Sequence, residues 1–265
     1  MSATFGLPNP VALVTGSVAP RVGRVIAEHL ASLGCRIAVH GRKDEERAQT
    51  AAEEIASTHD VETLALVGDL GDAAISEGLA NQTADHFGRL DIVVNSAAIW
   101  SPTPLDEIDA DEIRHYFNIN AIAPLLLSRA AAQIMRDQDR GGCVIQISDW
   151  ATVRPYLDHA AYFPSKGAIE VITRNLAVEL AQWNRSIRVN CVCPGPVLLA
   201  DDVDEATRDQ LAAATLLGRV GTPESIAHAV QFLCVNDFVT GVCLPVDGGR
   251  QVFAPDGLQV GKNTG

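Results

Sequence analysis

The chain has 265 residues, of which 47% are hydrophobic and 20% are charged, with 21 glycines and 13 prolines. This is ordinary globular usage in a chain long enough for one large domain, and it excludes collagen-like, disordered and disulfide-scaffold proteins. The 33 acidic side chains outnumber the 20 basic ones, and the net charge of −13 disfavours nucleic acid and anionic membranes as partners. Any anion that this protein binds must be held by a local arrangement of residues.

Short apolar runs alternate with longer amphipathic runs along the whole chain. The apolar runs predict strands at Val11–Val14, Arg36–His40, Thr63–Val67, Ile92–Asn95, Cys143–Ser148, Arg188–Val192 and Val242–Val246. The amphipathic runs predict helices at Val22–Leu33, Asp44–Ser57, Asp72–Phe87, Asp109–Ala132, Ala160–Trp183, Asp204–Ala214 and Pro223–Cys234. Runs such as LALV and VIQI are continuously apolar, as in strands that are covered on both faces.

This alternation predicts an α/β fold, namely a single-domain Rossmann-type, doubly wound parallel sheet of about seven strands over residues 1–265. The Gly-rich, polar tail from about residue 253 is expected to be loose or docked on a neighbouring subunit. The stretch Met1–Pro20 lacks the basic segment of a signal peptide. Elsewhere, the longest stretches without Asp, Glu, Lys or Arg, such as His115–Ser128, are too short to span a membrane. We therefore expect a cytoplasmic protein.

The six cysteines form no CxxC motif, and most lie in apolar runs, which favours buried and reduced thiols over a disulfide framework. A zinc site needs clustered partners, and Cys191 and Cys193 have no nearby pair of histidines. The sequence therefore predicts no metal site.

In a doubly wound sheet, ligands bind beyond the carboxyl ends of the strands. After the first strand, Gly16 and Gly23 flank a turn into a helix whose N-terminal amides can bind a pyrophosphate. Arg21 lies between these glycines and adds a positive charge where a phosphate would lie.

The second predicted strand ends at His40 and is followed by Arg42 and Lys43, where dinucleotide sites without a 2′-phosphate usually carry a carboxylate. We expect Arg42, with Lys43 or His40, to neutralise the 2′-phosphate of NADPH. The alternative is that these are solvated charges at the start of a helix.

Tyr162 and Lys166 are four residues apart in a predicted helix, so their side chains share a face. A nearby ammonium stabilises a phenolate and is expected to lower the pKa of Tyr162 from about 10 towards neutrality. The phenol would then be a usable acid at neutral pH.

The segments TG…VGR, GDL, NSAA, NINAIAP, YFPSK, CPGP and TGVCLPVDGG occur in this order over nearly the whole chain, and together they resemble the short-chain dehydrogenase/reductase family. The resemblance implies that Tyr162 donates a proton to the substrate and that Lys166 holds the nicotinamide ribose and tunes Tyr162. It also implies that Asn120 supports a water linking Lys166 to solvent, that Asp69 contacts the adenine, and that the protein is a homotetramer. The expected cofactor-binding residues are Gly16, Arg21, Val22, Gly23, His40, Arg42, Lys43, Asp69, Leu70, Asn95, Ser96, Ala97, Ser148, Tyr162, Lys166, Pro194 and Gly195.

Departures from the family pattern indicate the substrate. Arg21 replaces a usual glycine in a loop that is one residue longer than usual. Asp149 stands thirteen residues before Tyr162, where the family's catalytic serine lies, and the adjacent Ser148 is expected to face the other side of its strand. With Trp100 after the fourth strand, these features resemble the pteridine reductase and dihydromonapterin reductase branch.

A carboxylate at position 149 would repel an alkoxide, but it suits a substrate with N–H donors and a ring nitrogen that takes up a proton. We therefore expect hydride transfer from NADPH to a C=N bond of a dihydropterin, with dihydrofolate as a further candidate, and proton delivery by Tyr162 and Asp149. Arg21, Trp100, Asp149 and Tyr162 are the expected substrate contacts.

Alternatives stay open for two of these residues and for the function. Asp149 could form a salt bridge with Arg154 in a degenerate site, and Trp100 could be a plain hydrophobic lid residue. The protein could be a carbonyl reductase for a sugar, ketone or acyl substrate, or a non-catalytic NADP(H)-binding regulator. The presence of Asn120, Tyr162 and Lys166 argues against the regulator, which has no need of a tuned phenol.

Overall fold

Seven parallel strands form one sheet in the order β3-β2-β1-β4-β5-β6-β7 in the computed structural model, which describes residues 6–198 and 203–253. The strands are β1 (Val11–Val14), β2 (Arg36–Gly41), β3 (Thr63–Val67), β4 (Ile92–Asn95), β5 (Gly142–Ile147), β6 (Ile187–Pro194) and β7 (Cys243–Val246). The strand order reverses between β1 and β4, and such a reversal opens a crevice at the carboxyl ends of the strands. The predicted doubly wound parallel sheet is confirmed.

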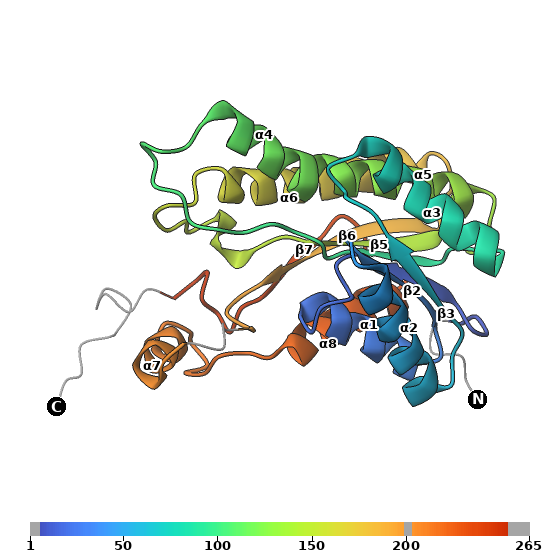
Figure 1. Cartoon of the computed structure of the whole chain (residues 1–265), viewed down its shortest axis with the longest axis horizontal. Helices are drawn as coiled ribbons and strands as arrows, with labels where there is room; N and C mark the ends of the chain where they lie inside the picture. The colour runs from blue at the N-terminus through green and yellow to red at the C-terminus, as the bar shows by residue number, and fades with distance from the viewer. Residues whose placement is uncertain (1–5, 199–202, 254–265) are drawn as a thin grey trace.

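Helices cover both faces of the sheet (Figure 1). One layer contains α3 (Ala73–Phe87), α4 (Ala110–Phe117), α5 (Ala123–Arg136) and α6 (Tyr162–Ala181). The other contains α1 (Val22–Ser32), α2 (Glu45–His59) and α8 (Pro223–Val235), and α7 (Glu205–Ala213) lies to one side of it. Within the described residues, no helix is both long and apolar enough to cross a membrane. From residue 254 onwards, the predicted tail lies outside the described residues.

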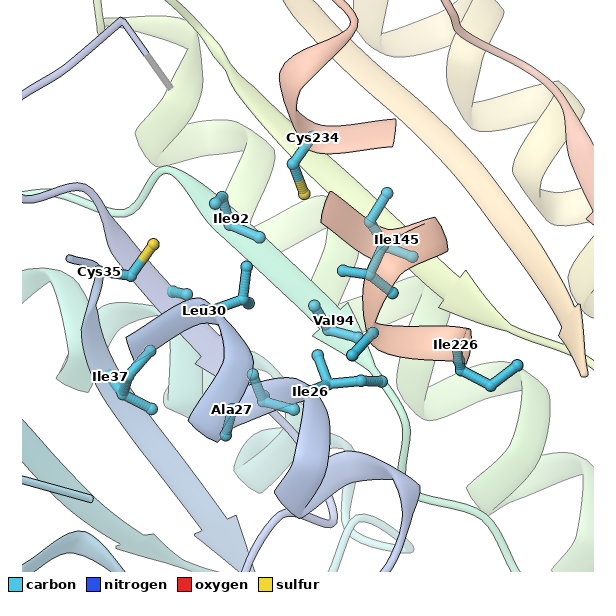
Figure 2. Packing of buried hydrophobic residues seen from close by; sticks show 14 of the residues in the cluster. Ile26, Ala27, Leu30, Cys35, Ile37, Ile92, Val94, Ile145, Ile226 and Cys234 are labelled. Atoms are coloured by element: carbon cyan, nitrogen blue, oxygen red, sulfur yellow. The ribbon is translucent and has the colours of Figure 1, made fainter. Parts of the chain in front are cut away.

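Because both faces are covered, the sheet divides the hydrophobic core in two. Ala12 and Val14 of β1 face the α1 and α8 side, whereas Val11 and Leu13 face the α3, α5 and α6 side. Figure 2 shows the first of these cores, where Ile26 and Leu30 of α1 and Ile226 of α8 lie against Ile92, Val94 and Ile145 of the strands. Burial on both faces explains why the strand sequences are continuously apolar.

Local capping chemistry places several helix starts where the sequence predicts them. The side chains of Asp44, Asp72 and Asp109 accept hydrogen bonds from backbone amides at the starts of α2, α3 and α4. Each such cap contributes about 1 kcal/mol to helix stability. The α3 helix ends at Gly88, whose φ of 78° lies in the left-handed region that favours glycine. Most predicted boundaries therefore agree with the observed ones to within a few residues.

The expectation of one continuous helix over Asp109–Ala132 is wrong. A π-helix over Asn118–Ile122 separates α4 from α5. This segment contains Asn120, whose side chain makes hydrogen bonds in both directions with the backbone of Ile99, after β4. A π-helix accommodates an extra residue within a helix and is frequent at functional sites, so a tertiary contact replaces regular helical geometry here.

Candidate active site

A cleft of about 610 Å³ lies at the carboxyl ends of β1, β2, β4, β5 and β6, next to the strand-order reversal. Its lining includes most of the residues that the sequence places at a cofactor or substrate. These are Gly16, Arg21, Val22, Gly23, His40, Arg42, Lys43, Asp69, Leu70, Ser96, Ala97, Trp100, Ser148, Asp149, Tyr162, Lys166, Pro194 and Gly195.

The turn after β1 brings three segments into close contact. Gly16 has a φ of 66°, and a Cβ atom there would lie 2.8 Å from the Cα of Ala97, after β4. A Cβ at Gly23 would lie 2.6 Å from the carbonyl oxygen of Gly16. No side chain caps the start of α1, and its first turn contains no acidic residue. These uncapped amides, beside the exposed Arg21, fit an anionic group such as a pyrophosphate.

Cations gather where β2 leads into α2. Arg42 Nε donates a hydrogen bond of 2.9 Å to Asp69 Oδ2, and the backbone N–H of Gly71 donates to Asp69 Oδ1 at 2.9 Å. The Gly71 hydrogen bond and the Arg42 guanidinium hold the pKa of the Asp69 carboxyl below its usual range. Lys43 and Arg47 also line the cleft, and neither forms a salt bridge with a described residue. Positive charge therefore remains available at this end.

The His40 side chain is turned into the protein, although it borders the cleft. Its Nε2–H donates to the carbonyl oxygen of Gly68 at 3.0 Å, and its Nδ1 accepts from the Gly16 N–H at 3.4 Å. Burial lowers the pKa of this imidazole, which favours the neutral form. Because both ring nitrogens are engaged, His40 holds the β1 turn against the loop after β3 and has no ring nitrogen left for a phosphate.

Asp149, Tyr162 and Lys166 meet at the opposite end of the cleft. The Tyr162 hydroxyl, at the start of α6, donates a hydrogen bond of 2.9 Å to Asp149 Oδ2, after β5. The backbone N–H of Ala151 donates to the other carboxylate oxygen at 2.8 Å. Lys166 lies one turn further along α6 and is almost fully buried, with Nζ donating to the carbonyl oxygen of Ile147 at 2.8 Å. The side chains of all three residues therefore reach one small volume.

Burial dominates the titration of these groups. It raises the pKa of the Asp149 carboxyl, although hydrogen bonds from Ala151 and Tyr162 and the charge of Lys166 act in the opposite direction. It lowers the pKa of the Lys166 ammonium. The expectation that Lys166 lowers the pKa of Tyr162 is wrong for this structure. Burial and the adjacent Asp149 carboxylate raise the pKa of the phenol far above its usual value.

Asn95 and Asn120 lie behind the cleft rather than in its lining. Asn95 Nδ2 donates to the Ser128 hydroxyl at 3.1 Å. Asn120 Nδ2 donates to the Ile99 carbonyl oxygen and to the Ser165 hydroxyl, both at 3.1 Å. Asn120 therefore joins the loop after β4 to α6, and its role in a water chain to Lys166 stays a prediction.

Ser148 lines the cleft, but its hydroxyl is directed at α6. It donates to the carbonyl oxygen of Lys166 at 3.0 Å, and Glu170 Oε1 accepts from it at 3.4 Å. Ser148 therefore shares no hydrogen bond with the Tyr162 hydroxyl, and Asp149 alone occupies the position beside the phenol.

Aromatic side chains form a wall at the reaction end of the cleft. Trp100 has 56% of its surface exposed, and its ring is stacked on the ring of His159 with centroids 5.1 Å apart.

Arg154 makes no salt bridge with Asp149. Its guanidinium instead donates to the carbonyl oxygens of Arg250 and Phe253. The alternative of a degenerate Asp149–Arg154 pair is therefore wrong.

Several residues that line the cleft were not predicted from the sequence. They are mostly apolar side chains or backbone positions around the turn after β1, after β4 and after β6, such as Val18, Ala19, Ile99, Ile119 and Leu198. Such residues carry no chemical signal in the sequence. Arg47 could have been predicted, because it lies in the first turn of the helix that begins just after Arg42 and Lys43.

Comparison with known proteins agrees with this architecture. The family model described as enoyl-(acyl carrier protein) reductase matches residues 18–251. Pteridine reductase 1 of Leishmania tarentolae is 32% identical over 91% of this chain and 96% of its own length. The 3alpha-hydroxysteroid dehydrogenase of Mediterraneibacter gnavus is 34% identical over 92% and 98% of the respective lengths. A crystal structure described as a short-chain alcohol dehydrogenase from Sinorhizobium meliloti 1021 is 28% identical and superimposes with a TM-score of 0.85 over 93% of this chain and 98% of that one.

Relatives with different substrates in their names match to similar degrees, so the comparisons assign the family and leave the substrate to the chemistry of the site. Proteins of this family generally bind NAD(P)(H) and act on small molecules. The cleft fits such a dinucleotide, because it combines an uncapped helix start, close glycine contacts and a basic rim. The chain belongs to the short-chain dehydrogenase/reductase family of oxidoreductases.

Proposed function

We propose that this protein is an NADPH-dependent pteridine reductase that acts on the C=N bond of a dihydropterin, with dihydrofolate as a further substrate to test. The observation that carries the proposal is the 2.9 Å hydrogen bond between Tyr162 and Asp149 at the inner end of the cleft. A carboxyl group there can exchange protons with a ring nitrogen, which the serine usual in the family cannot do.

Bound NADPH would supply the hydride for the carbon atom of the C=N bond. The Tyr162 hydroxyl supplies the proton for the adjacent nitrogen. Burial raises the pKa of the Asp149 carboxyl above its ordinary value. When this carboxyl group is protonated, its O–H can donate across the 2.9 Å contact to the Tyr162 oxygen. In that form Asp149 can replace the proton that Tyr162 loses, which avoids the phenolate that the burial of Tyr162 disfavours.

The lining beside this pair suits a flat heterocycle with N–H donors. The exposed ring of Trp100 offers a stacking face that His159 holds in place from behind. Asp149 Oδ2 can accept from a ring N–H, since the Ala151 amide binds the other carboxylate oxygen. Arg21 lines the same cleft and can serve both the pyrophosphate and the polar edge of a pterin.

The basic rim supports NADPH over NADH. Arg42, Lys43 and Arg47 line one end of the cleft, and Asp69 is the carboxylate that pairs with one of them. A 2′-phosphate would gain charge-assisted hydrogen bonds at this rim, whereas the unphosphorylated ribose would not.

We further propose that the enzyme is one domain over residues 1–265 and a cytoplasmic homotetramer. It acts on small molecules and has no nucleic-acid or membrane partner. The homotetramer in this proposal is the assembly that the family resemblance implies.

A carbonyl reductase for a sugar, ketone or acyl substrate is the second candidate. A protonated Asp149 would no longer repel a developing alkoxide, and burial raises the pKa of this carboxyl group. Relatives named for steroid and sugar substrates are consistent with this candidate. A purely regulatory NADP(H)-binding protein is less well supported, because Tyr162, Asp149 and Lys166 are assembled for proton transfer.

The testing experiment measures NADPH oxidation by the wild-type enzyme with a dihydropterin, dihydrofolate and a panel of ketones and sugars. We expect turnover of the dihydropterin at a kcat/KM well above that of any ketone. Brisk reduction of a ketone without turnover of any pterin would favour the second candidate. NADPH binding without turnover of any compound would favour the regulator.

A further inference from the structure

Three thiols lie together outside the cleft, on the face of β6 and β7 that α6 covers. Cys191 and Cys193 of β6 are buried against Ile169 of α6, and their sulfur atoms are 4.0 Å apart. Cys243 of the edge strand β7 packs beside them but is partly exposed. In the parallel register of the two strands, Cys243 lies directly opposite Cys191. The partly exposed thiol of Cys243 therefore lies opposite the buried thiol of Cys191.

Cys243 lies beside a guanidinium and a carboxylate of α6. Arg174 of α6 extends its Nη1 atom to 3.4 Å from Cys243 Sγ, and it forms no salt bridge with a described residue. Glu170, one turn earlier on α6, acts in the opposite direction: its carboxylate raises the pKa of the Cys243 thiol, and its backbone carbonyl oxygen accepts a hydrogen bond of 3.8 Å from Cys243 Sγ. The hydrogen bond with Cys191 and the Arg174 guanidinium lower the pKa of the Cys243 thiol despite its partial burial. Partial exposure beside a cation is the environment of reactive cysteines.

The core between the sheet and α8 contains three further cysteines, which serve as controls for the reactivity of Cys243. Cys143 and Cys234 also lie next to each other, but both are buried between the sheet and α8. Cys35 is buried in the same core, and Figure 2 shows Cys35 and Cys234 among its aliphatic side chains. Burial also raises the pKa of the Cys35 thiol. These three thiols are expected to be inert towards reagents in water.

We propose that Cys243 is an oxidation site for hydroperoxides and that Cys191 resolves the product as a disulfide. The Cys243 thiolate attacks the terminal oxygen of the hydroperoxide, so that an S–O bond forms, the O–O bond breaks, and the leaving alkoxide or hydroxide takes up a proton. Cys191 sulfur then attacks Cys243 sulfur. An S–S bond forms, the S–O bond breaks, and the leaving hydroxide combines with the Cys191 proton as water. In total, two thiols and one hydroperoxide give one disulfide, one alcohol or water, and one further water.

The strand geometry permits this disulfide. Neighbouring strands of a sheet lie about 4.8 Å apart, which is inside the range of about 4.4–6.8 Å for the Cα atoms of bonded cysteines. A disulfide at an exposed sheet edge is expected to be reducible by small thiols.

The first arm of the test measures alkylation of the folded, full-length protein by iodoacetamide. We expect Cys243 to react fastest of the six cysteines. Arg174→Gln should slow this reaction about threefold or more, because less thiolate is present, whereas Arg174→Lys should keep most of the rate. Arg129→Gln, which removes an exposed arginine of α5 that pairs with Glu77, serves as the matched control and should change nothing. A Cys243 rate no higher than that of Cys35, or insensitive to Arg174→Gln, would overturn the proposal.

The second arm treats the folded protein with hydrogen peroxide and maps tryptic peptides by tandem mass spectrometry. Cleavage after Arg188 and Arg208 leaves Cys191 and Cys193 in one peptide, and cleavage after Arg219 and Arg250 leaves Cys234 and Cys243 in another. Cys193→Ser and Cys234→Ser should each retain the cross-link between these peptides. Cys191→Ser should abolish it and leave Cys243 as a sulfenic acid that a dimedone probe captures.

Loss of the cross-link in Cys234→Ser, or its persistence in Cys191→Ser, would overturn the assigned pair. If a serine variant fails to fold by circular dichroism, the arginine variants still decide whether Cys243 is activated, because Arg174 is a surface residue of α6.

Discussion

The two ends of the cleft use charge in opposite ways. At the β2 end, the cleft is lined by three exposed cations, Arg42, Lys43 and Arg47. At the α6 end, Lys166 is almost fully buried and Asp149 is largely withdrawn from water, so burial shifts the pKa of both groups. Salt screens the attraction between an exposed charge and a charged ligand. A buried group instead has a shifted pKa, and this pKa determines how readily the group gives up or takes up a proton. We therefore propose that the β2 end selects the cofactor and that the α6 end performs the chemistry.

Tyr162→Phe should give the largest effect, because it removes the proton donor while keeping the ring. We expect kcat to fall by about 10³-fold or more and the Kd of NADPH to change little. Steady-state rates and a fluorescence titration with NADPH measure the two quantities. Lys166→Ala is the contrasting variant and should impair both. Retention of most of the rate in Tyr162→Phe would move the acid elsewhere, with Asp149 as the first residue to examine.

Asp149→Ser restores the residue usual in the family and should still lose about 10²-fold in kcat with a dihydropterin. A hydroxyl cannot replace the proton that Tyr162 loses in the way that a carboxyl group can. Asp149→Ala should behave similarly on the pterin. If Asp149→Ser matched the wild type on the pterin, the carboxyl group would have no part in proton delivery.

Removing the rim cations together, as Arg42→Ala with Lys43→Ala and Arg47→Ala, should abolish the preference for NADPH. We expect the wild-type preference in kcat/KM to be about 10–100-fold, equivalent to about 1.4–3 kcal/mol, which a charge-assisted phosphate contact can supply. Activity with NADH should be nearly unchanged in the variant. Arg114→Ala, an exposed cation of α4, is the control. Equal use of both cofactors by the wild type would contradict the assignment of this end.

Trp100→Ala should have a smaller effect on the substrate. Loss of one stacking face is expected to weaken the binding of a flat antifolate by about 1 kcal/mol, or about fivefold in its inhibition constant. Competitive inhibition against the dihydropterin gives this value. An unchanged constant would mean that Trp100 is only a hydrophobic lid over the site.

Asp149→Asn should stabilise the protein while it removes activity. The pKa of Asp149 is raised in the folded chain, so its contribution to stability is full below the unfolded pKa of about 3.9 and is lost as the pH rises through the folded value. At pH 7 the neutral amide avoids burying a charge, and we expect a gain of about 1 kcal/mol, or about 2–4 °C in Tm. The gain should shrink towards pH 4, and the exposed control Asp85→Asn should show none. A lower Tm at pH 7 would contradict the burial argument.

The fold was more predictable than the details of the site. Continuous apolar strands and aspartate caps such as Asp44 and Asp72 are local signals, so the sheet and most helix starts follow from short stretches of sequence. The π-helix around Asn120 was not predictable from a local pattern, and the side chain of Asn120 bonds to Ile99 on another segment. The engagement of both ring nitrogens of His40 depends in the same way on Gly16 and Gly68.

By itself, the sequence determined the element order, the residue types at the strand ends and the pairing of Tyr162 with Lys166 on one helix, because each depends on spacing within a short segment. Only the tertiary structure decided that Asp149 of the β5 end meets the Tyr162 hydroxyl at 2.9 Å, since these groups come from different elements. The same holds for the pKa of the phenol. The sequence places a cation four residues away, which would lower it, but burial and the Asp149 carboxylate raise it. Solvent exclusion depends on everything that surrounds a group, and no local pattern encodes it.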